Sequence, residues 1–135
     1  MKFYPKPYKT IIIDDEQLAR ERLLKLVANF PNHFKVIDTA KNGTEAKEKI
    51  NQLKPDVIFL DIEMPGLTGF ELLDELEQIP LVIFCTAFDQ YALQAFETHS
   101  IDYLVKPVRL ERLEKTVEKH VLFKGTHNSK KLLEP

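Results

Sequence analysis

The chain has 135 residues, of which 44% are hydrophobic and 30% are charged, and its formal net charge is −2. These values are typical of one soluble globular domain and argue against broad electrostatic binding of nucleic acid, and no apolar run approaches the roughly 20 residues that span a bilayer. The one cysteine, Cys85, excludes an intramolecular disulfide and lies in an apolar run, so we expect a buried thiol in a cytoplasmic protein.

The chain is predicted to form one domain with a short extension at each end. Residues 1–8 include Pro5 and Pro7, whose fixed φ angles and missing amide protons favour an extended arm. Over 123–135 the apolar periodicity is lost, so we predict a linker or C-terminal tail there. The folded domain is therefore expected over 9–122.

The first predicted strand ends in two acids. A β-branched run over 10–13 is typical of a buried strand, and Asp14 and Asp15 follow it directly. Apolar residues at helical spacing then predict a helix over 16–30, with Asp15 as its N-cap.

A second strand and helix follow, and the third strand again ends in an acid. The run 34–40 predicts a strand, and an Asn-Gly pair turns the chain into a helix that ends before Pro55. The short apolar run 57–61 predicts the third strand. It ends on Asp61, ahead of a loop with one proline and two glycines.

The next helix begins with a capping signal. Thr68 and Glu71 have the spacing of a capping box, in which each side chain binds a backbone amide of the first turn. A fourth strand is predicted over 81–86, and Asp89 is a candidate cap for a short helix over 90–98.

A fifth strand over 101–105 is followed at once by Lys106-Pro107, and a last helix is expected over 109–120. Strands alternating with helices predict an α/β fold, in which a parallel sheet is covered on both faces by right-handed crossovers. Ligands of such sheets bind outside the carboxyl ends of the strands, where the strand order reverses.

Four of the predicted strand ends carry residues that suit phosphoryl transfer. They are Asp14 and Asp15, Asp61, Thr86 and Lys106. If the strand order is 2-1-3-4-5, the three carboxylates converge, and their repulsion favours a hard divalent ion such as Mg²⁺. The lysine would add positive charge and the threonine a hydroxyl donor.

Asp61 is the predicted nucleophile, because it directly ends the central strand. The acids after the first strand would be metal ligands, and Glu63 is expected to offer its backbone carbonyl rather than its side chain to the metal. Taken singly, Asp15 can be explained as a helix cap, Thr86 as a strand end and Lys106 as a solvated charge. Their joint placement favours a functional site.

Motifs over about residues 9–122 resemble the receiver domain of two-component response regulators. These motifs are IIIDDE, FLDIEMPGLTG, FCTAF and DYLVKP, in this order. The stretch TAFDQYALQAFETHSIDYLVKP further resembles the LytTR (LytR/AlgR-like) subgroup, whose receivers are joined to a DNA-binding domain. The resemblance implies a flavodoxin-like (βα)5 doubly wound parallel sheet of order 2-1-3-4-5.

The resemblance also implies a role for each candidate residue. Asp61 would be phosphorylated by a sensor histidine kinase or a small phosphodonor, with Asp14 and Asp15 beside it around Mg²⁺ or Mn²⁺. Thr86 and Lys106 would contact the phosphoryl oxygens. Such a domain catalyses only its own phosphoryl transfer and is not an enzyme for a separate substrate.

Output is implied to run through an aromatic switch. Thr86 would move toward the phosphoryl group, and Tyr103 would turn into the space that it leaves. In such domains the Lys106-Pro107 bond is cis. The alternative for Tyr103 is a half-buried strand aromatic without a switching role.

The switch is expected to change the surface of the fourth helix, fifth strand and fifth helix and to promote a two-fold homodimer. DNA would be contacted by a C-terminal output domain and not by this domain, and no membrane contact is expected. Candidate surface residues are Gln90, Tyr91, Gln94, Glu97, Asp102, Arg109, Glu111, Arg112 and Lys115.

Phe88, two residues after Thr86, could shield a phosphorylated Asp61 from water and so slow its hydrolysis. The alternative is that its ring only packs at the base of the loop.

Two other functions remain open from the residues. One is a hydrolytic phosphotransferase, although the sequence Asp61-Ile62-Glu63 lacks the second aspartate that haloacid-dehalogenase-like phosphatases use. The other is a phosphorylation-independent interaction module on the same fold.

Overall fold

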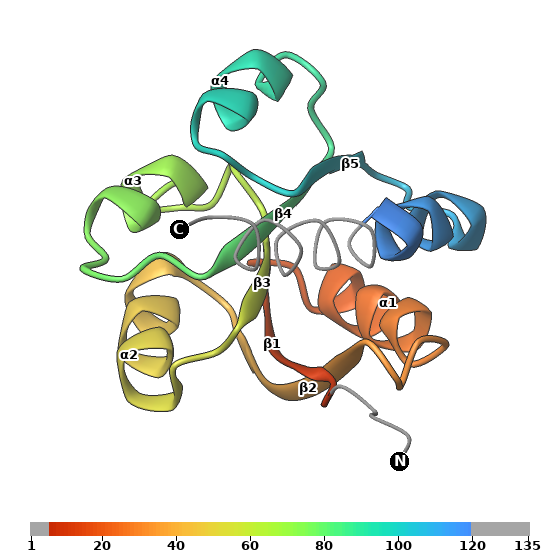
Figure 1. The fold of residues 1–135 in the computed structure, drawn as a ribbon. Coiled ribbons are helices and arrows are strands. Elements are labelled where there is room, and N and C mark those ends of the chain that lie inside the picture. The colour runs from red at the N-terminus through yellow and green to blue at the C-terminus, as the bar shows by residue number, and fades with distance from the viewer. Residues whose placement is uncertain (1–5, 120–135) are drawn as a thin grey trace, which may run out of the picture.

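The computed structural model of this chain describes residues 6–119, and Figure 1 shows a central sheet with helices on both of its faces. Residues 1–5 of the predicted arm and the whole predicted tail over 123–135 lie outside the described residues. Within the described part, no helix is long and apolar enough to cross a membrane.

The sheet consists of parallel strands in the order β2-β1-β3-β4-β5. This order confirms the predicted α/β fold with a doubly wound 2-1-3-4-5 sheet. β1 starts inside the predicted arm, because the Tyr8 amide donates to the His33 carbonyl at 2.8 Å and opens the ladder to β2. The strand bounds are β1 Tyr8–Ile13, β2 Phe34–Ala40, β3 Val57–Leu60, β4 Leu81–Thr86 and β5 Asp102–Val105.

Helices cover the two faces of the sheet unequally. In Figure 1, α1 and a last helix lie on one face, and α2, α3 and α4 lie on the other. The last helix starts at residue 110 and continues to the end of the described residues at 119. The other bounds are α1 Gln17–Val27, α2 Gly43–Leu53, α3 Gly69–Asp74 and α4 Ala92–Glu97.

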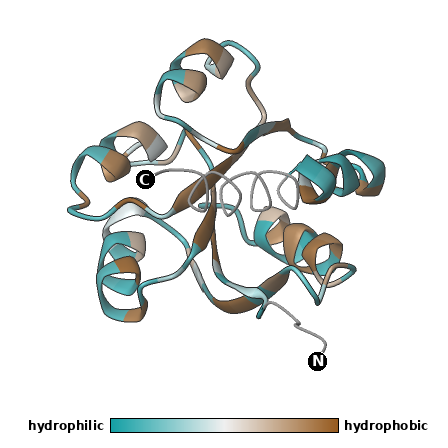
Figure 2. Cartoon of the chain, viewed as in Figure 1, coloured by the Kyte–Doolittle hydropathy of each residue, from teal (hydrophilic) through white to brown (hydrophobic). Residues whose placement is uncertain are grey.

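Two apolar cores hold these layers together. Ile11 and Ile13 of β1 face the core that contains residues of α2 and α3, whereas Ile12 faces the core that contains residues of α1 and the last helix. All three are at most 1% exposed, and burying each side chain stabilises the fold by roughly 1.5–3 kcal/mol. Figure 2 shows the hydrophobic colour concentrated along the strands. The central strands are therefore apolar on both faces, as parallel sheets require.

The predicted capping box opens α3. Thr68 Oγ1 accepts from the Glu71 amide at 3.2 Å, and the Glu71 carboxylate accepts from the Thr68 amide at 3.0 Å. This prediction is confirmed, because the signal is local and both partners lie within one turn.

Two other predicted helix starts are wrong. The N-cap of α1 is Glu16 rather than Asp15, because Asp14 Oδ1 already accepts from the Glu16 amide at 2.9 Å and holds that turn. α4 is shorter than the predicted 90–98, since its N-cap is Tyr91, which has non-helical φ and ψ angles, and Asp89 makes no side-chain cap.

Candidate functional site

Three side chains that follow different strands meet at the carboxyl edge of the sheet. The Lys106 ammonium, just after β5, donates to Asp14 Oδ2 at 2.6 Å and to Asp61 Oδ2 at 3.2 Å. Asp14 follows β1 and Asp61 follows β3, and these strands are neighbours. The sheet order therefore brings two of the predicted carboxylates to one cation.

Asp61 lies in a tightly packed turn at the end of β3. It is 5% exposed, and its Oδ1 accepts from the Ile62 amide at 2.7 Å. The start of α3 approaches so closely that a β-carbon at Gly69 would lie 2.5 Å from the Asp61 carbonyl oxygen. Only glycine permits this approach, which fixes the loop after Asp61 against the sheet.

The charges of the site oppose one another. Burial raises the pKa of the Asp61 carboxyl above its ordinary value, and the negative charge of Asp14 raises it further. The ammonium of Lys106 and the hydroxyl of Thr86 lower this pKa, but they do not outweigh burial. Burial alone would lower the pKa of Lys106, but its bonds to Asp14 and Asp61 outweigh burial and raise it. Lys106 is therefore a permanent cation at neutral pH.

Three consecutive acids offer oxygen ligands beside this cation. The ligand atoms of Asp14, Asp15 and Glu16 all lie within 4.8 Å of one another. An all-oxygen set suits Mg²⁺ or Mn²⁺, so the residues present fit a divalent ion. Sequence reasoning missed Glu16, although it ends the acidic run. Asp61 is not part of this cluster, and its Oδ2 lies on Lys106 instead.

The predicted switch residues are linked through one backbone segment. Thr86 is fully buried at the end of β4, and its Oγ1 accepts from the Phe88 amide at 3.4 Å. The half-buried Tyr103 donates its hydroxyl proton to the Phe88 carbonyl, and its ring lies 6.2 Å from that of Phe84. Movement of Thr86 would thus act on the residue that holds Tyr103.

The loop between Lys106 and the last helix completes the site. The Lys106-Pro107 peptide bond is cis. The Lys106 amide donates to the Thr86 carbonyl at 2.8 Å, which ties the end of β5 to the end of β4.

Two further residues form hydrogen bonds with residues of the site, and no sequence motif predicts these contacts. Arg20 Nη1 donates to the Asp14 carbonyl at 2.8 Å, and the Tyr91 hydroxyl donates to Glu63 Oε2 at 3.1 Å. Tyr91 and Glu63 are 28 positions apart, so no local pattern could have paired them.

One predicted surface residue is buried. Asp102 is 8% exposed, and its carboxylate accepts from Arg112 Nη2 at 2.7 Å, Arg112 Nη1 at 3.0 Å and Thr116 Oγ1 at 2.8 Å. The predicted placement of Asp102 on the switching surface is therefore wrong, because the last helix covers it and binds its charge.

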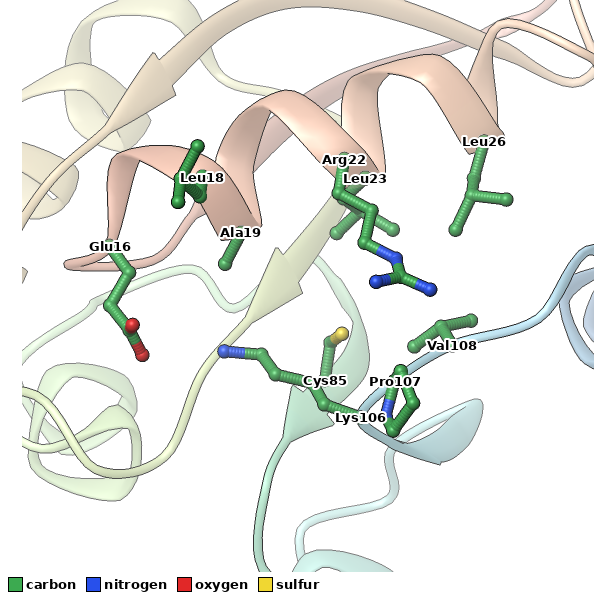
Figure 3. A pocket seen from close by; sticks show the side chains of 10 residues that line it. All are labelled: Glu16, Leu18, Ala19, Arg22, Leu23, Leu26, Cys85, Lys106, Pro107 and Val108. Carbon is green, nitrogen blue, oxygen red and sulfur yellow. The ribbon is translucent and has the colours of Figure 1, made fainter.

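An apolar cavity of about 360 Å³ lies beside the site, between α1 and the loop at Pro107. Figure 3 shows side chains of α1 on one side of it and Cys85, Lys106 and Pro107 on the other. Cys85 is buried, as predicted, and burial raises the pKa of its thiol to about 12. The thiol is therefore protonated and unreactive at neutral pH.

Comparison with known proteins agrees with this geometry. Residues 10–118 match the family described as "Response regulator receiver domain". An "Uncharacterized response regulatory protein" of Vibrio cholerae serotype O1 is 56% identical over 111 residues, which are 81% of this chain and 46% of that protein. A "Positive alginate biosynthesis regulatory protein" of Pseudomonas aeruginosa is 49% identical over 112 residues, which are 81% and 45% of the two chains. This chain thus spans about half the length of these relatives.

A solved structure shows the same likeness in three dimensions. It is a CheX-CheY-BeF3-Mg+2 complex from Borrelia burgdorferi, which matches with a TM-score of 0.73 at 26% identity. The match covers 83% of this chain and 87% of that chain.

Proposed function

The chain belongs to the response regulator receiver domain family of two-component systems, and we propose that its Asp61 accepts a phosphoryl group from a sensor histidine kinase or a small phosphodonor. The bridge that Lys106 forms between the carboxylates of Asp14 and Asp61 carries this proposal. It sets a buried carboxylate next to a cation at the edge of the sheet where ligands of this fold bind.

The proposed reaction is a direct displacement at phosphorus. A carboxylate oxygen of Asp61 forms a bond to phosphorus while the bond to the histidine nitrogen, or to the acyl oxygen of a small donor, breaks. Lys106 stays protonated and neutralises charge on the phosphoryl oxygens, and the hydroxyl of Thr86 donates to one of them. Asp61 is thus both nucleophile and product-bearing residue, and no separate substrate is turned over.

A divalent cation is part of the proposal. Asp14, Asp15 and Asp61, with the backbone carbonyl of Glu63, would hold Mg²⁺ or Mn²⁺, which when bound supplies positive charge beside the transferred group. The acidic cluster at Asp14 supports this assignment, as does the Mg²⁺ and BeF3 of the Borrelia burgdorferi complex.

Readout is proposed to pass through Thr86 and Tyr103. A doubly charged group on Asp61 attracts the Thr86 hydroxyl. The hydrogen bond from the Phe88 amide to Thr86 Oγ1 then breaks. Because the Phe88 carbonyl accepts from Tyr103, that ring is then free to take a new position. The two hydrogen bonds of Phe88 support this route.

We further propose that phosphorylation promotes a homodimer through the α4–β5 face, defined here as Leu93, Phe96, Val105 and Leu110. Leu93 and Phe96 of α4 are 73% and 77% exposed, and Val105 of β5 and Leu110 of the last helix are exposed as well. Exposed large apolar side chains favour an interface over a solvated surface. These side chains support the dimer better than the mixed charges predicted from sequence.

The output is proposed to be a transcriptional one, carried by a C-terminal DNA-binding domain of the LytTR type in the cytoplasm. Support comes from the regulatory relative of Pseudomonas aeruginosa, which is about twice as long as the region it shares with this chain. The receiver itself has a net charge of −2 and is not proposed to touch DNA.

Incubation with acetyl phosphate and Mg²⁺ tests the central proposal. The unmodified chain should gain one phosphoryl group, and Asp61→Asn should gain none. Labelling of both proteins would place the phosphoryl group elsewhere and overturn the assignment of Asp61.

A further inference from the structure

One side-chain hydrogen bond joins the loop after β3 to the segment after β4. The hydroxyl of Tyr91 donates to Glu63 Oε2 at 3.1 Å. Glu63 lies two residues after Asp61 in the loop that follows β3, and Tyr91 lies in the segment between β4 and α4. Since β3 and β4 are paired neighbours, this bond joins the two loops that flank Asp61.

The ring of Tyr91 is fixed by two aromatic neighbours. Its centroid lies 6.3 Å from that of Phe88, in an edge-to-face arrangement at 77°, and 6.2 Å from that of Phe70, at 64°. Phe70 belongs to α3 and packs on the buried Phe84 at 5.2 Å. Tyr91 is therefore anchored on the core at one end and on the Glu63 carboxylate at the other.

The Glu63 carboxylate accepts a hydrogen bond from Tyr91. Within the described residues no cation forms a salt bridge with Glu63. The side-chain partner of Glu63 is therefore Tyr91.

We propose that Tyr91 is a positioning residue that holds Glu63 and Phe88 over Asp61 and thereby lengthens the lifetime of the phosphorylated state. This inference rests on the proposed phosphorylation of Asp61. Dephosphorylation is hydrolysis: a water oxygen bonds to phosphorus, the bond from phosphorus to the Asp61 oxygen breaks, and inorganic phosphate and the carboxylate are released. Joined loops restrict the approach of that water, because Phe88 and Glu63 cannot separate without breaking the hydrogen bond from Tyr91 to Glu63 or the edge-to-face contact of Tyr91 with Phe88.

The test is a double-mutant cycle on the decay of the phosphorylated full chain. Each protein is loaded with acetyl phosphate and Mg²⁺, the donor is removed, and the first-order loss of the phosphoryl group is followed by intact mass. Tyr91→Phe removes only the hydroxyl, and Glu63→Ala removes the side chain that carries its acceptor. Tyr8→Phe is the matched control, because it deletes a hydroxyl at the start of β1, at the opposite end of the strand from the site.

Tyr91→Phe and Glu63→Ala should each speed decay by roughly 3- to 10-fold, the range expected for the loss of one hydrogen bond. The double variant should decay no faster than the faster single variant, since both remove the same bond. Glu63→Gln keeps an acceptor oxygen and should decay at a rate closer to that of the unmodified chain, as should Tyr8→Phe.

Two results would overturn the proposal: decay of Tyr91→Phe at the unmodified rate, or a double variant whose acceleration is the product of the two single ones. The thermal midpoint of Tyr91→Phe should stay unchanged, which separates positioning from a loss of folding. A failure of the proposed function gives a different outcome, because then the unmodified chain takes up no phosphoryl group at all.

Discussion

At the scale of the residue, Lys106 determines how two buried carboxylates can lie side by side. Its ammonium contacts both Asp14 and Asp61, yet the pKa of Asp61 is still raised by burial, with the charge of Asp14 adding to it. A carboxyl with a raised pKa is destabilising when ionised, so its charge lowers the stability of the folded state above that pKa. The ionised carboxylate of Asp61 therefore lowers the stability of the folded state.

We expect Asp61→Asn to stabilise the protein when no divalent cation is bound. Asparagine removes the unfavourable charge and keeps an oxygen for the Ile62 amide. The gain should be about 1 kcal/mol at pH 7, measured by urea unfolding in the presence of EDTA. It should shrink as the pH falls toward the ordinary aspartate pKa of about 3.9, where the unmodified carboxyl is neutral as well. A destabilised variant would contradict this electrostatic account.

Phe88 gives a second prediction at this scale. Its ring is partly exposed and packs edge-to-face on Tyr91, beside the proposed phosphorylation site. We expect Phe88→Ala to speed hydrolysis of phosphorylated Asp61 severalfold, because water reaches phosphorus more freely, with the decay followed by intact mass. Equal decay rates would favour the alternative that the ring only packs at the base of the loop.

At the scale of the element, an ion pair between the buried Asp102 and the partly exposed Arg112 fastens the last helix to β5. Asp102 accepts two hydrogen bonds from Arg112, and Arg112 Nη2 also donates to the Tyr103 carbonyl at 3.3 Å. Burial would raise the pKa of Asp102, but the hydrogen bonds of Arg112 and Thr116 outweigh it and lower that pKa. The helix is thus joined to the strand that carries the proposed switch residue.

We expect Asp102→Asn to destabilise the fold by about 1–3 kcal/mol at pH 7. This loss is smaller than for a fully buried ion pair, because Arg112 is partly exposed and water screens its charge. A lowered pKa contributes stability above the unfolded value of about 3.9, and this contribution is lost as the pH falls through the folded value. The difference between variant and unmodified chain, measured by urea unfolding, should therefore narrow below about pH 4. A difference that does not depend on pH would contradict the ion pair as its cause.

The elements themselves could be predicted from sequence to different degrees. The strands could be placed because buried parallel strands are continuous apolar runs, and the Thr68 capping box is a local signal. The burial of Asp102 could not be predicted, since it depends on contacts with the last helix. The length of α4 could not be predicted either, because Tyr91 is not helical and instead contacts Glu63 and Phe88.

At the scale of the whole molecule, the strand order creates the site. Parallel neighbours β1 and β3 put Asp14 and Asp61 at one edge, and β5 supplies Lys106 to both. This convergence could be expected from sequence, because each residue directly follows an apolar run. The partner of Glu63 could not be expected, since side chains that meet across two loops leave no periodic pattern.

The α4–β5 face gives a prediction at the same scale. Phe96→Glu replaces one of the apolar side chains of this face by a charge, at a position that is 77% exposed, so the substitution should have little effect on folding. We expect the variant to stay monomeric in analytical ultracentrifugation with beryllofluoride and Mg²⁺, whereas the unmodified chain dimerises. An unmodified chain that sediments as a monomer with and without the mimic would rule out the dimer.

Intact-mass measurement after treatment with acetyl phosphate decides whether Asp61 is the phosphoacceptor. We expect one added phosphoryl group on the unmodified chain with Mg²⁺, none with EDTA, and none on Asp61→Asn with Mg²⁺. Phosphorylation of Asp61→Asn, or no phosphorylation of a folded unmodified chain in the presence of Mg²⁺, would rule out this role of Asp61.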